Sequence, residues 1–434
     1  MDLSLINEFQ SSELPIHKSY LQNVSPTSLA VNNDVLSENP FIFSNELDYN
    51  LPITNQRSSG RCWLFATCNL IRMIAHNKWS EELDIQVDDF EISQNYLYFY
   101  DKLERYHRNL RYYLDIINLD DELKDRYMYS LLQDPLGDGG QWDMAKEIVK
   151  KYGIVPKSVY PDSFHSKRSR EMNTILTEEL KSDMLKLSIV DEELIDNEIK
   201  LIMKKVYDIL VSFLGKPPTK FNWTFKSKKS ICIWKDLTPL SLLEKTGFNP
   251  DDWVSVVNDP RKENTYGKYY QVKYLGNVLH QHVGWLNVPM DRLKLLAKNS
   301  IDNKYPVWFG CDVGKNHHRE SGVKDINVFS LDAFISISKS MTKEDKLKTF
   351  TSLPNHAMLI TGYHLDEEIK RWKIENSWGD KSGHKGYLLM TDKWMDEYTF
   401  QIVVHKDLLS SEEKESLSVE PLIIPPWDPL GTLA

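Results

Sequence analysis

The chain has 434 residues, of which 41% are hydrophobic and 11% aromatic, and this composition is typical of a globular protein with two or three packed lobes. It excludes wholesale disorder and a fibrous protein. The formal net charge of −10 argues against a general nucleic-acid-binding surface, which would normally carry net positive charge.

Targeting signals and cysteine usage indicate the compartment. Residues 1–24 have neither the basic start nor the uninterrupted apolar run of a secretory signal. No window approaches the roughly 20 apolar residues that a membrane-spanning helix requires. The cysteines, Cys62, Cys68, Cys232 and Cys311, form no C-x-x-C pair and suit a reducing compartment. We therefore expect a cytoplasmic protein without a membrane partner.

The first half of the chain predicts helices. Residues 1–50 are polar with scattered apolar positions and predict an arm that lies on the body. Residues 62–74 are apolar on nearly every side, which predicts a buried helix. The stretch 89–132 combines charged and aromatic residues at helical spacing and predicts surface helices. Apolar residues recur at steps of four and three over 195–213, which predicts a helix that ends at Gly215.

The second half predicts strands. Short alternating or β-branched runs lie at residues 221–225, 307–310, 356–361 and 372–374. The tail from Ser410 is acidic at first and then rich in proline, which favours an extended, polyproline-like segment. Helices followed by strands predict an α+β protein with segregated lobes, and the seam between such lobes is a natural place for a cleft.

One cysteine lies where a nucleophile is expected. Cys62 follows Gly60 and Arg61 at the start of the predicted buried helix. Unpaired backbone N–H groups and the helix dipole favour an anion at such a position. We therefore expect a stabilised Cys62 thiolate, which is the form of cysteine that attacks carbonyl groups.

Three further residues complete a candidate catalytic group. His356 opens a predicted strand and precedes Asn376, whose amide oxygen would fix the tautomer and direction of the imidazole, as in a Cys-His-Asn triad. Trp378 would shield that hydrogen bond from water. Gln56 lies shortly before Cys62, and its side-chain amide would form an oxyanion hole with the Cys62 backbone N–H.

Motifs along much of the chain carry a family resemblance. They are Asn55-Gln56, Ser59-Gly60-Arg61-Cys62-Trp63-Leu64-Phe65-Ala66, Asp138-Gly139-Gly140-Gln141-Trp142, Pro306-Val307-Trp308-Phe309-Gly310-Cys311-Asp312-Val313-Gly314, His356-Ala357-Met358, Glu375-Asn376-Ser377-Trp378-Gly379 and Trp427-Asp428-Pro429. Together they resemble the bleomycin hydrolase and aminopeptidase C family of papain-like cysteine peptidases. Ser59 and Arg61 depart from the more familiar papain pattern and point to the bleomycin hydrolase branch.

This resemblance implies a papain-like two-lobed α+β fold, with a helical lobe, a strand-rich and barrel-like lobe, helical insertions and an extended C-terminal tail. We expect an N-terminal arm (1–50), a helical lobe with the nucleophile helix (51–160), a mainly helical insertion (161–270), a strand-rich lobe with His356 and Asn376 (271–405) and a tail that enters the active-site cleft (406–434).

The resemblance also implies how substrate is bound. Gly139 and Gly140 match a Gly-Gly segment that offers backbone hydrogen bonds to a peptide, and glycine lets a ligand approach closely. Asn355, just before His356, is expected to contribute a backbone carbonyl. The carboxylate of Ala434 would pair with the free α-amine of a substrate while the tail blocks longer chains.

The activity implied is that of a cysteine aminopeptidase, which removes N-terminal residues from peptides through a thiolate and an acyl-enzyme. The resemblance adds hydrolysis of bleomycin-type amides and of homocysteine thiolactone. It implies a homohexamer that encloses its active sites, and neither a cofactor nor a metal.

Other residues keep structural interpretations. A cysteine in a core is usually inert, and we assign no chemistry to Cys68, Cys232 or Cys311. The histidines at 280–282 and 317–318 have no third and fourth ligands at a recognisable spacing, so we expect no metal site.

A different class of function is also open. In it, a papain-fold scaffold has lost catalysis, and basic clusters such as residues 167–170 and 226–229 form a nucleic-acid-binding surface. These clusters are short and are more typical of solvated faces. Strong salt-dependent binding to single strands would support this alternative.

Overall fold

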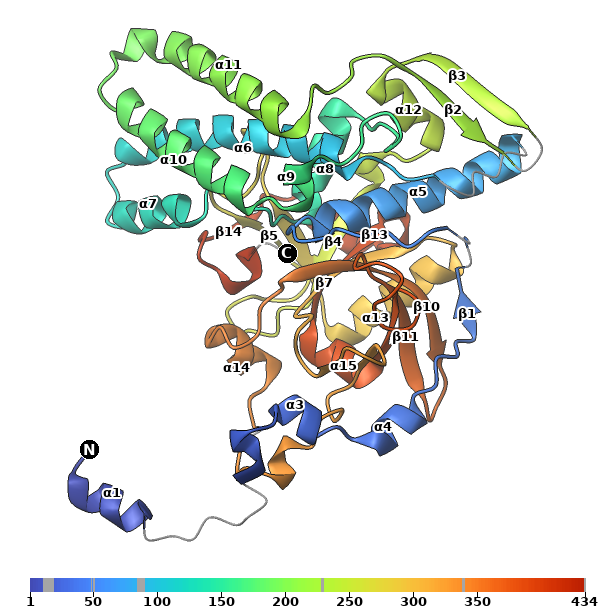
Figure 1. Ribbon diagram of the computed structural model, residues 1–434. Coiled ribbons are helices and arrows are strands. Elements are labelled where there is room, and N and C mark those ends of the chain that lie inside the picture. The colour runs from blue at the N-terminus through green and yellow to red at the C-terminus, as the bar shows by residue number, and fades with distance from the viewer. Residues whose placement is uncertain are drawn as a thin grey trace.

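The computed structural model describes residues 1–10, 19–47, 49, 51–83, 90–227, 230–337 and 340–432. Figure 1 shows a helical lobe above and a strand-rich lobe below, with helix α5 (Cys62–Leu83) running along the boundary between them. The chain therefore has helices and strands in separate layers, as the sequence predicts.

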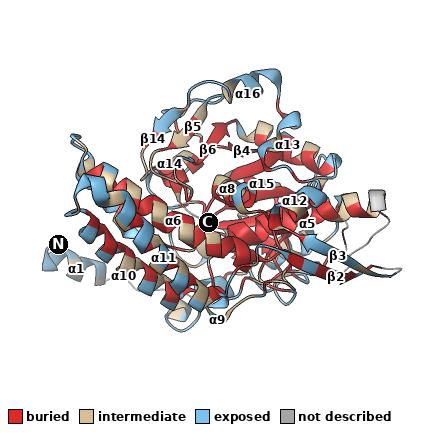
Figure 2. Cartoon of the chain, turned by 90° about the horizontal axis from the view of Figure 1, so that it is seen from above, coloured by how far each residue is buried: buried red, intermediate tan, exposed pale blue. Residues whose placement is uncertain are grey.

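Helix α5 is the central helix of the molecule. It contacts β7 (Val307–Cys311) and β10 (His356–Leu365) of the sheet on one side, and other helices on the other. Its residues from Cys62 to Met73 are buried, and Figure 2 shows α5 as largely buried. The predicted buried helix is therefore confirmed, because an apolar surface on every side suits a helix enclosed by two lobes.

The helical lobe is built around a long helix, α6. Its main helices are α6 (Gln94–Ile117), α7 (Lys124–Gln133), α8 (Trp142–Tyr152), α9 (Phe164–Lys167), α10 (Arg170–Leu187), α11 (Ile195–Leu214) and α12 (Pro239–Thr246). Helix α6 contacts α5, α7, α8, α10 and α11. The prediction of surface helices over 89–132 is wrong for α6, which these neighbours bury along most of its length. Its charged residues suggested exposure to solvent, but several of them are paired inside the lobe, as Asp101 and Arg105 are.

The amphipathic helix α11 agrees with its predicted pattern over its first half. Ile199, Ile202 and Val206 are buried on one stripe, which then continues through Leu210 and Leu214. Helix α11 ends before Gly215, whose φ of +91° is a backbone conformation that glycine adopts readily. Figure 2 shows that α10 and α11 keep an exposed face.

The strand-rich lobe holds one large mixed sheet. In the described residues its path runs β14-β5-β6-β4-β13-β7-β10-β11-β12-β9-β8, and β1 pairs with β10 off this path. The remaining strands are β1 (Asn45–Glu46), β4 (Trp253–Val257), β5 (Tyr269–Val272), β6 (Gly284–Asn287), β8 (His317–His318), β9 (Val323–Lys324), β11 (Lys370–Glu375), β12 (Tyr387–Thr391), β13 (Thr399–His405) and β14 (Leu422–Ile424). The strands predicted at 307–310, 356–361 and 372–374 are β7, β10 and β11.

Several elements pack on this sheet or lie beside it. Helices α13 (Met290–Asp302) and α15 (Asp392–Tyr398) contact it, while α14 (Lys343–Lys348) and α16 (Ser411–Ser416) lie in its connections. A separate hairpin of β2 (Phe221–Lys226) and β3 (Ile231–Leu237) lies with the helices in Figure 1. The strand predicted at 221–225 is β2.

The two ends of the chain differ in how they meet the body. Helix α1 (Leu3–Gln10) stands apart in Figure 1, whereas α3 (Pro26–Leu29) and α4 (Asn33–Glu38) lie beside the strand-rich lobe. At the other end, β14 adds a parallel strand to β5. Strand β4 precedes residue 270 and β5 crosses it, yet both belong to the large sheet, and the division of the chain into five parts stays a prediction.

Candidate active site

The segment before α5 is fastened to the segment that follows β11. The backbone N–H of Gln56 donates to the carbonyl of Ser377 at 2.8 Å, and Asn55 forms a bridge with Trp378. The Gln56 side chain donates through Nε2 to the Ser59 carbonyl at 2.7 Å and accepts from the Ser377 hydroxyl at 2.6 Å. Gln56 is therefore buried and fixed six residues before α5 begins.

His356 and Asn376 are brought together by neighbouring strands. His356 is the first residue of β10, and Asn376 follows β11, which pairs with β10. The Nε2 atom of His356 lies 2.9 Å from Oδ1 of Asn376. Because an amide oxygen only accepts, Nε2 carries the proton and Nδ1 is the basic nitrogen. The ring of Trp378 lies 4.9 Å from the imidazole and covers it.

Cys62 lies against the start of the same strand. The backbone N–H of Ala357, which follows His356, forms a hydrogen bond to the Cys62 sulfur, and the N–H groups of Cys62 and Trp63 add to it. The N-terminus of α5 therefore faces the first residues of β10. The predicted residues Gln56, Cys62, His356 and Asn376 lie in one place at the seam between the lobes.

Burial controls the charges of the cysteine and the histidine. It raises the pKa of the Cys62 thiol to about 11 and lowers the pKa of His356 to about 4, despite the opposing bonds from Ala357 and Asn376. Desolvation therefore opposes the N–H groups at the start of α5, and the stabilised Cys62 thiolate stays a prediction. Moving the proton from sulfur to imidazole leaves the net charge of the pair unchanged, so the pair can form the nucleophile together.

Asp138 organises the turn beside Cys62. Its carboxylate accepts from the backbone N–H of Gly60 at 3.0 Å and from the Tyr98 hydroxyl and Asn173 amide at 2.5 Å each. It also accepts from the Ser169 hydroxyl and forms an ion pair with buried Lys102 at 3.3 Å. The Lys102 charge and these hydrogen bonds hold the pKa of Asp138 well below its usual range. The partners of Asp138 are scattered along the chain, so no local sequence pattern identifies them.

The Gly-Gly segment is held by packing. The Gly139 carbonyl accepts from Arg105 at 3.0 Å. A Cβ atom at Gly140 would lie 2.4 Å from the Trp63 ring, so glycine is required there by the close approach of that ring. Hydrogen bonds from Gly139 and Gly140 to a substrate stay a prediction.

Asn355 is fixed by its side chain. Its amide donates to Asp312 at 2.7 Å and accepts from the backbone N–H of Val313 at 3.0 Å. This bidentate contact ties the residue before His356 to the end of β7. A substrate contact by its carbonyl remains untested.

The tail enters the seam between the lobes. The Nε2 atom of Gln141, at the start of α8, donates to the carbonyls of Leu430 at 2.9 Å and Thr432 at 2.7 Å. The Thr432 hydroxyl donates to the carbonyl of Pro354, two residues before His356, at 2.8 Å. Residues from each lobe therefore hold the tail. Ala434 lies outside the described residues.

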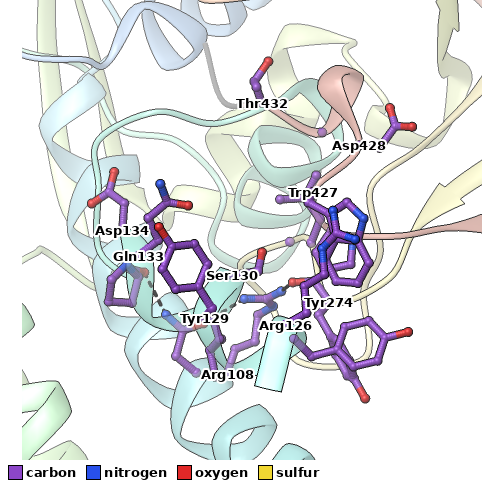
Figure 3. Close-up of a pocket in the computed structure, with 18 of the residues that line it drawn as sticks. Arg108, Arg126, Tyr129, Ser130, Gln133, Asp134, Tyr274, Trp427, Asp428 and Thr432 are labelled. Carbon is purple, nitrogen blue, oxygen red and sulfur yellow. Dashed lines mark hydrogen bonds between the residues drawn. The ribbon is translucent and has the colours of Figure 1, made fainter. Parts of the chain in front are cut away.

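Two cavities adjoin these elements. One, of about 600 Å³, lies where Trp427 and Thr432 of the tail face α6 and α7, and Figure 3 shows Arg108 and Arg126 on its wall. The other, of about 750 Å³, is lined by Ser59, Gly60 and Asp138 beside the nucleophile turn and by residues of α10. The second cavity therefore lies beside the turn that precedes Cys62.

Other candidate chemistry is sparse in the described part of the chain. No group of three or more His, Cys, Asp and Glu side chains in it is placed to hold a metal ion. Cys68, Cys232 and Cys311 are free, and Cys311 lies opposite His356 in the sheet. None of the described helices is long and apolar enough to cross a bilayer.

Comparisons with known proteins cover nearly the whole chain. A model of the Peptidase C1-like family matches residues 4–431. The chain is 39% identical to aminopeptidase C of Streptococcus thermophilus over 96% of this chain and 93% of that protein. It is 37% identical to human bleomycin hydrolase over 88% of this chain and 86% of that protein. The crystal structure of PepW from Lactobacillus rhamnosis HN001 superposes with a TM-score of 0.91 at 34% identity, covering 99% of this chain and 98% of that one.

Proposed function

The chain belongs to the Peptidase C1-like family and is a cysteine-type peptidase, and we propose that it removes residues from the free N-terminus of peptides. The predicted resemblance to bleomycin hydrolase and aminopeptidase C is confirmed, as is the papain-like α+β fold. The observation that carries the proposal is the pair His356 and Asn376, 2.9 Å apart, beside the Cys62 sulfur.

The proposed reaction uses Cys62 as nucleophile and His356 as acid and base. The sulfur attacks the scissile carbonyl while its proton passes to Nδ1 of His356. The imidazolium then donates that proton to the leaving amine, and the C–N bond breaks to leave a thioester on Cys62. A water molecule, deprotonated by His356, hydrolyses the thioester and restores the thiol. Asn376 keeps the imidazole in the required tautomer throughout.

Gln56 is proposed to stabilise the negative oxygen of the tetrahedral intermediate. One N–H of its amide is used by the Ser59 carbonyl, and the backbone N–H of Cys62 lies at the first turn of α5, where N–H groups lack helical partners. The second amide N–H of Gln56 and this backbone N–H would donate to the oxyanion. Support comes from the Ser377 hydroxyl, which fixes the Gln56 oxygen and so orients its amide.

The tail is proposed to restrict cleavage to free N-termini. Its described residues reach Pro354, two residues before His356, and so occupy part of the cleft. A peptide extended through that space would collide with the tail. Ala434 lies outside the described residues, and the pairing of its carboxylate with a substrate amine stays a prediction.

Finer features of the function are also proposed. The match to human bleomycin hydrolase supports hydrolysis of bleomycin-type amides, and hydrolysis of homocysteine thiolactone follows from the same resemblance. A homohexamer and a cytoplasmic location remain predictions from the resemblance and from the cysteine usage.

The test compares the full chain with a chain truncated after Pro429. The substrates are a fluorogenic dipeptide with a free amine, its N-acetylated form and a longer internally quenched peptide, and Cys62→Ala is the control for thiol dependence. We expect the full chain to cleave only at free N-termini and the truncated chain to cleave all three substrates. If no substrate is cleaved in a Cys62-dependent manner, the proposal is overturned, and the alternative of a papain-fold scaffold without catalysis is favoured.

A further inference from the structure

Both hydrogen-bond donors of the Gln141 amide are used by the tail. Gln141 is buried, and its two N–H protons are directed at the carbonyls of Leu430 and Thr432. Its Oε1 atom is buried and has no hydrogen-bond partner among the described residues. The tail therefore supplies the hydrogen bonds that this amide makes in the described structure.

Contacts on each side of this amide position the tail. Upstream, Asp428 is fixed by an ion pair with Arg261 at 2.9 Å, and its carboxylate accepts from the backbone N–H of Leu430 at 2.9 Å. Downstream, the Thr432 hydroxyl binds the Pro354 carbonyl. These contacts position the two ends of the stretch 428–432, and the amide of Gln141 binds the carbonyls of Leu430 and Thr432 within it.

From this geometry we infer that Gln141 is a specificity-determining residue, because it fixes the register of the tail in the cleft and thereby the number of residues removed in one cleavage. The inference rests on the proposed function and adds the side chain that sets the product length. Gln141 directly follows the Gly139-Gly140 segment, and Thr432 is bound beside His356, so the register of the tail is defined on both sides of the site.

The register has a direct consequence for the product. An extended chain advances about 3.3 Å per residue. If the tail retreats by one residue, the substrate can advance by one residue, and a dipeptide is released where a single residue was released before. Loss of the tail contact also removes a buried partner from the Gln141 amide, which disfavours retreat in the native protein.

Two substitutions test this role. Gln141→Leu removes both hydrogen bonds with a similar side-chain volume, and Gln141→Glu places a carboxylate against two carbonyl oxygens. Gln133→Leu is the matched control, because Gln133 lines the cavity beside the tail, is exposed and makes no hydrogen bond to the tail in the described structure.

The main measurement identifies products of a free-amine octapeptide by mass spectrometry, together with kcat and KM for the free-amine and N-acetylated dipeptide substrates. We expect dipeptides and internal fragments from both Gln141 variants and single residues from Gln133→Leu. We also expect kcat/KM for the free-amine substrate to fall about 10-fold in Gln141→Leu, because a tail that has lost these hydrogen bonds holds the productive register for a smaller fraction of the time. Single-residue release with unchanged kcat/KM in both Gln141 variants overturns the inference.

Hydrogen exchange separates this inference from the proposed function. The backbone N–H groups of Trp427, Asp428 and residues 430–432 should exchange faster in both Gln141 variants than in the wild-type and Gln133→Leu proteins, whether or not any of these proteins is active. If the wild-type protein releases no N-terminal residues but the tail exchanges as expected, the proposed function fails while the anchoring by Gln141 stands. Unchanged exchange in both Gln141 variants overturns the anchoring itself.

Discussion

The carboxylate of Asp138 accepts a hydrogen bond from the backbone N–H of Gly60 at 3.0 Å. Gly60 lies two residues before Cys62, so this bond connects the loop that carries the Gly-Gly segment to the turn that carries the sulfur. The negative charge of Asp138 is balanced by Lys102, which donates to the carbonyls of Leu136 and Gly137 in the same loop. One ion pair therefore holds together both borders of the proposed cleft.

Asp138→Asn should lower the free energy of unfolding by about 3–5 kcal/mol, because it leaves the buried Lys102 ammonium without its counter-charge. Urea unfolding at pH 7 measures the loss. Asp134→Asn, at an exposed position in the same loop, is the control and should change stability by less than about 0.5 kcal/mol. Equal effects of the two substitutions would refute the assigned role of the ion pair.

This difference should also depend on pH. The folded-state pKa of Asp138 is lower than the usual value of 3.8, so its charge stabilises the protein above that value and the stabilisation is lost as pH falls through the folded pKa. The stabilities of wild type and Asp138→Asn should therefore begin to converge as the pH falls below about 4, and their difference should narrow further down to the folded pKa. A difference that stays constant down to the acid transition would argue against a charge effect.

Gln56→Ala should reduce kcat about 10²–10³-fold with little change in KM, because the second N–H of its amide is proposed to bind the substrate oxygen only when that oxygen becomes negative. Steady-state kinetics on the free-amine dipeptide measure both constants. Ser377→Ala should have a smaller effect, since it removes only the hydroxyl that orients the Gln56 oxygen. A rise in KM with unchanged kcat would show that Gln56 binds the ground state and does not serve the oxyanion.

The acid limb of Cys62 reactivity should lie near pH 4, because burial lowers the pKa of His356 to about that value. Below it His356 holds an extra proton and cannot accept one from the thiol. The rate of Cys62 alkylation by iodoacetamide, measured between pH 3.5 and 7 with Cys62→Ala for background labelling, tests this. Circular dichroism at each pH confirms that the fold persists. A limb near the ordinary histidine value of 6.5 would contradict the burial argument.

The buried Lys343, away from the proposed site, should make the stability of the protein depend on pH in a second range. Its buried ammonium donates to Asn258 at 2.9 Å and to the Thr399 carbonyl at 2.6 Å, and burial lowers its pKa from 10.5 to about 7. Between these values the unfolded chain binds a proton that the folded chain releases, so stability rises with pH across that window. Lys343→Met should remove this rise, whereas Lys348→Met on the same helix should keep it. Parallel curves of unfolding free energy against pH for the wild-type and Lys343→Met proteins would exclude the effect.

The sequence predicts the elements whose pattern is local. The apolar stretch after Cys62 is a buried helix, and the β-branched runs at 307–310 and 356–361 are neighbouring strands of the sheet. The burial of helix α6 could not be predicted in this way. Its charged residues are typical of a helix exposed to solvent, whereas the ion pair of Asp101 and Arg105 is buried. A sequence shows charges, but the partners that permit their burial are known only from the fold.

The candidate site shows the same division. Short motifs identify Gln56, Cys62, His356 and Asn376, and the structure brings them together. Asp138 and Gln141 contact residues that lie far away in the chain, and no local sequence pattern predicts these contacts. The burial of Cys62, which raises the pKa of its thiol, depends on residues of both lobes and is likewise absent from the local pattern.

The tail is bound by groups far away in sequence: Gln141 lies 289 residues before Leu430, and Pro354 lies 78 residues before Thr432. These contacts can form only after each lobe has folded. The tail is held by hydrogen bonds, the ion pair of Asp428 with Arg261 and only a few buried apolar side chains such as Leu430, whereas large hydrophobic cores hold the lobes. Segments with few buried apolar contacts open locally at low free energy. Mild denaturant should therefore undock the tail before the lobes unfold, so the range of accepted peptides should widen before activity disappears.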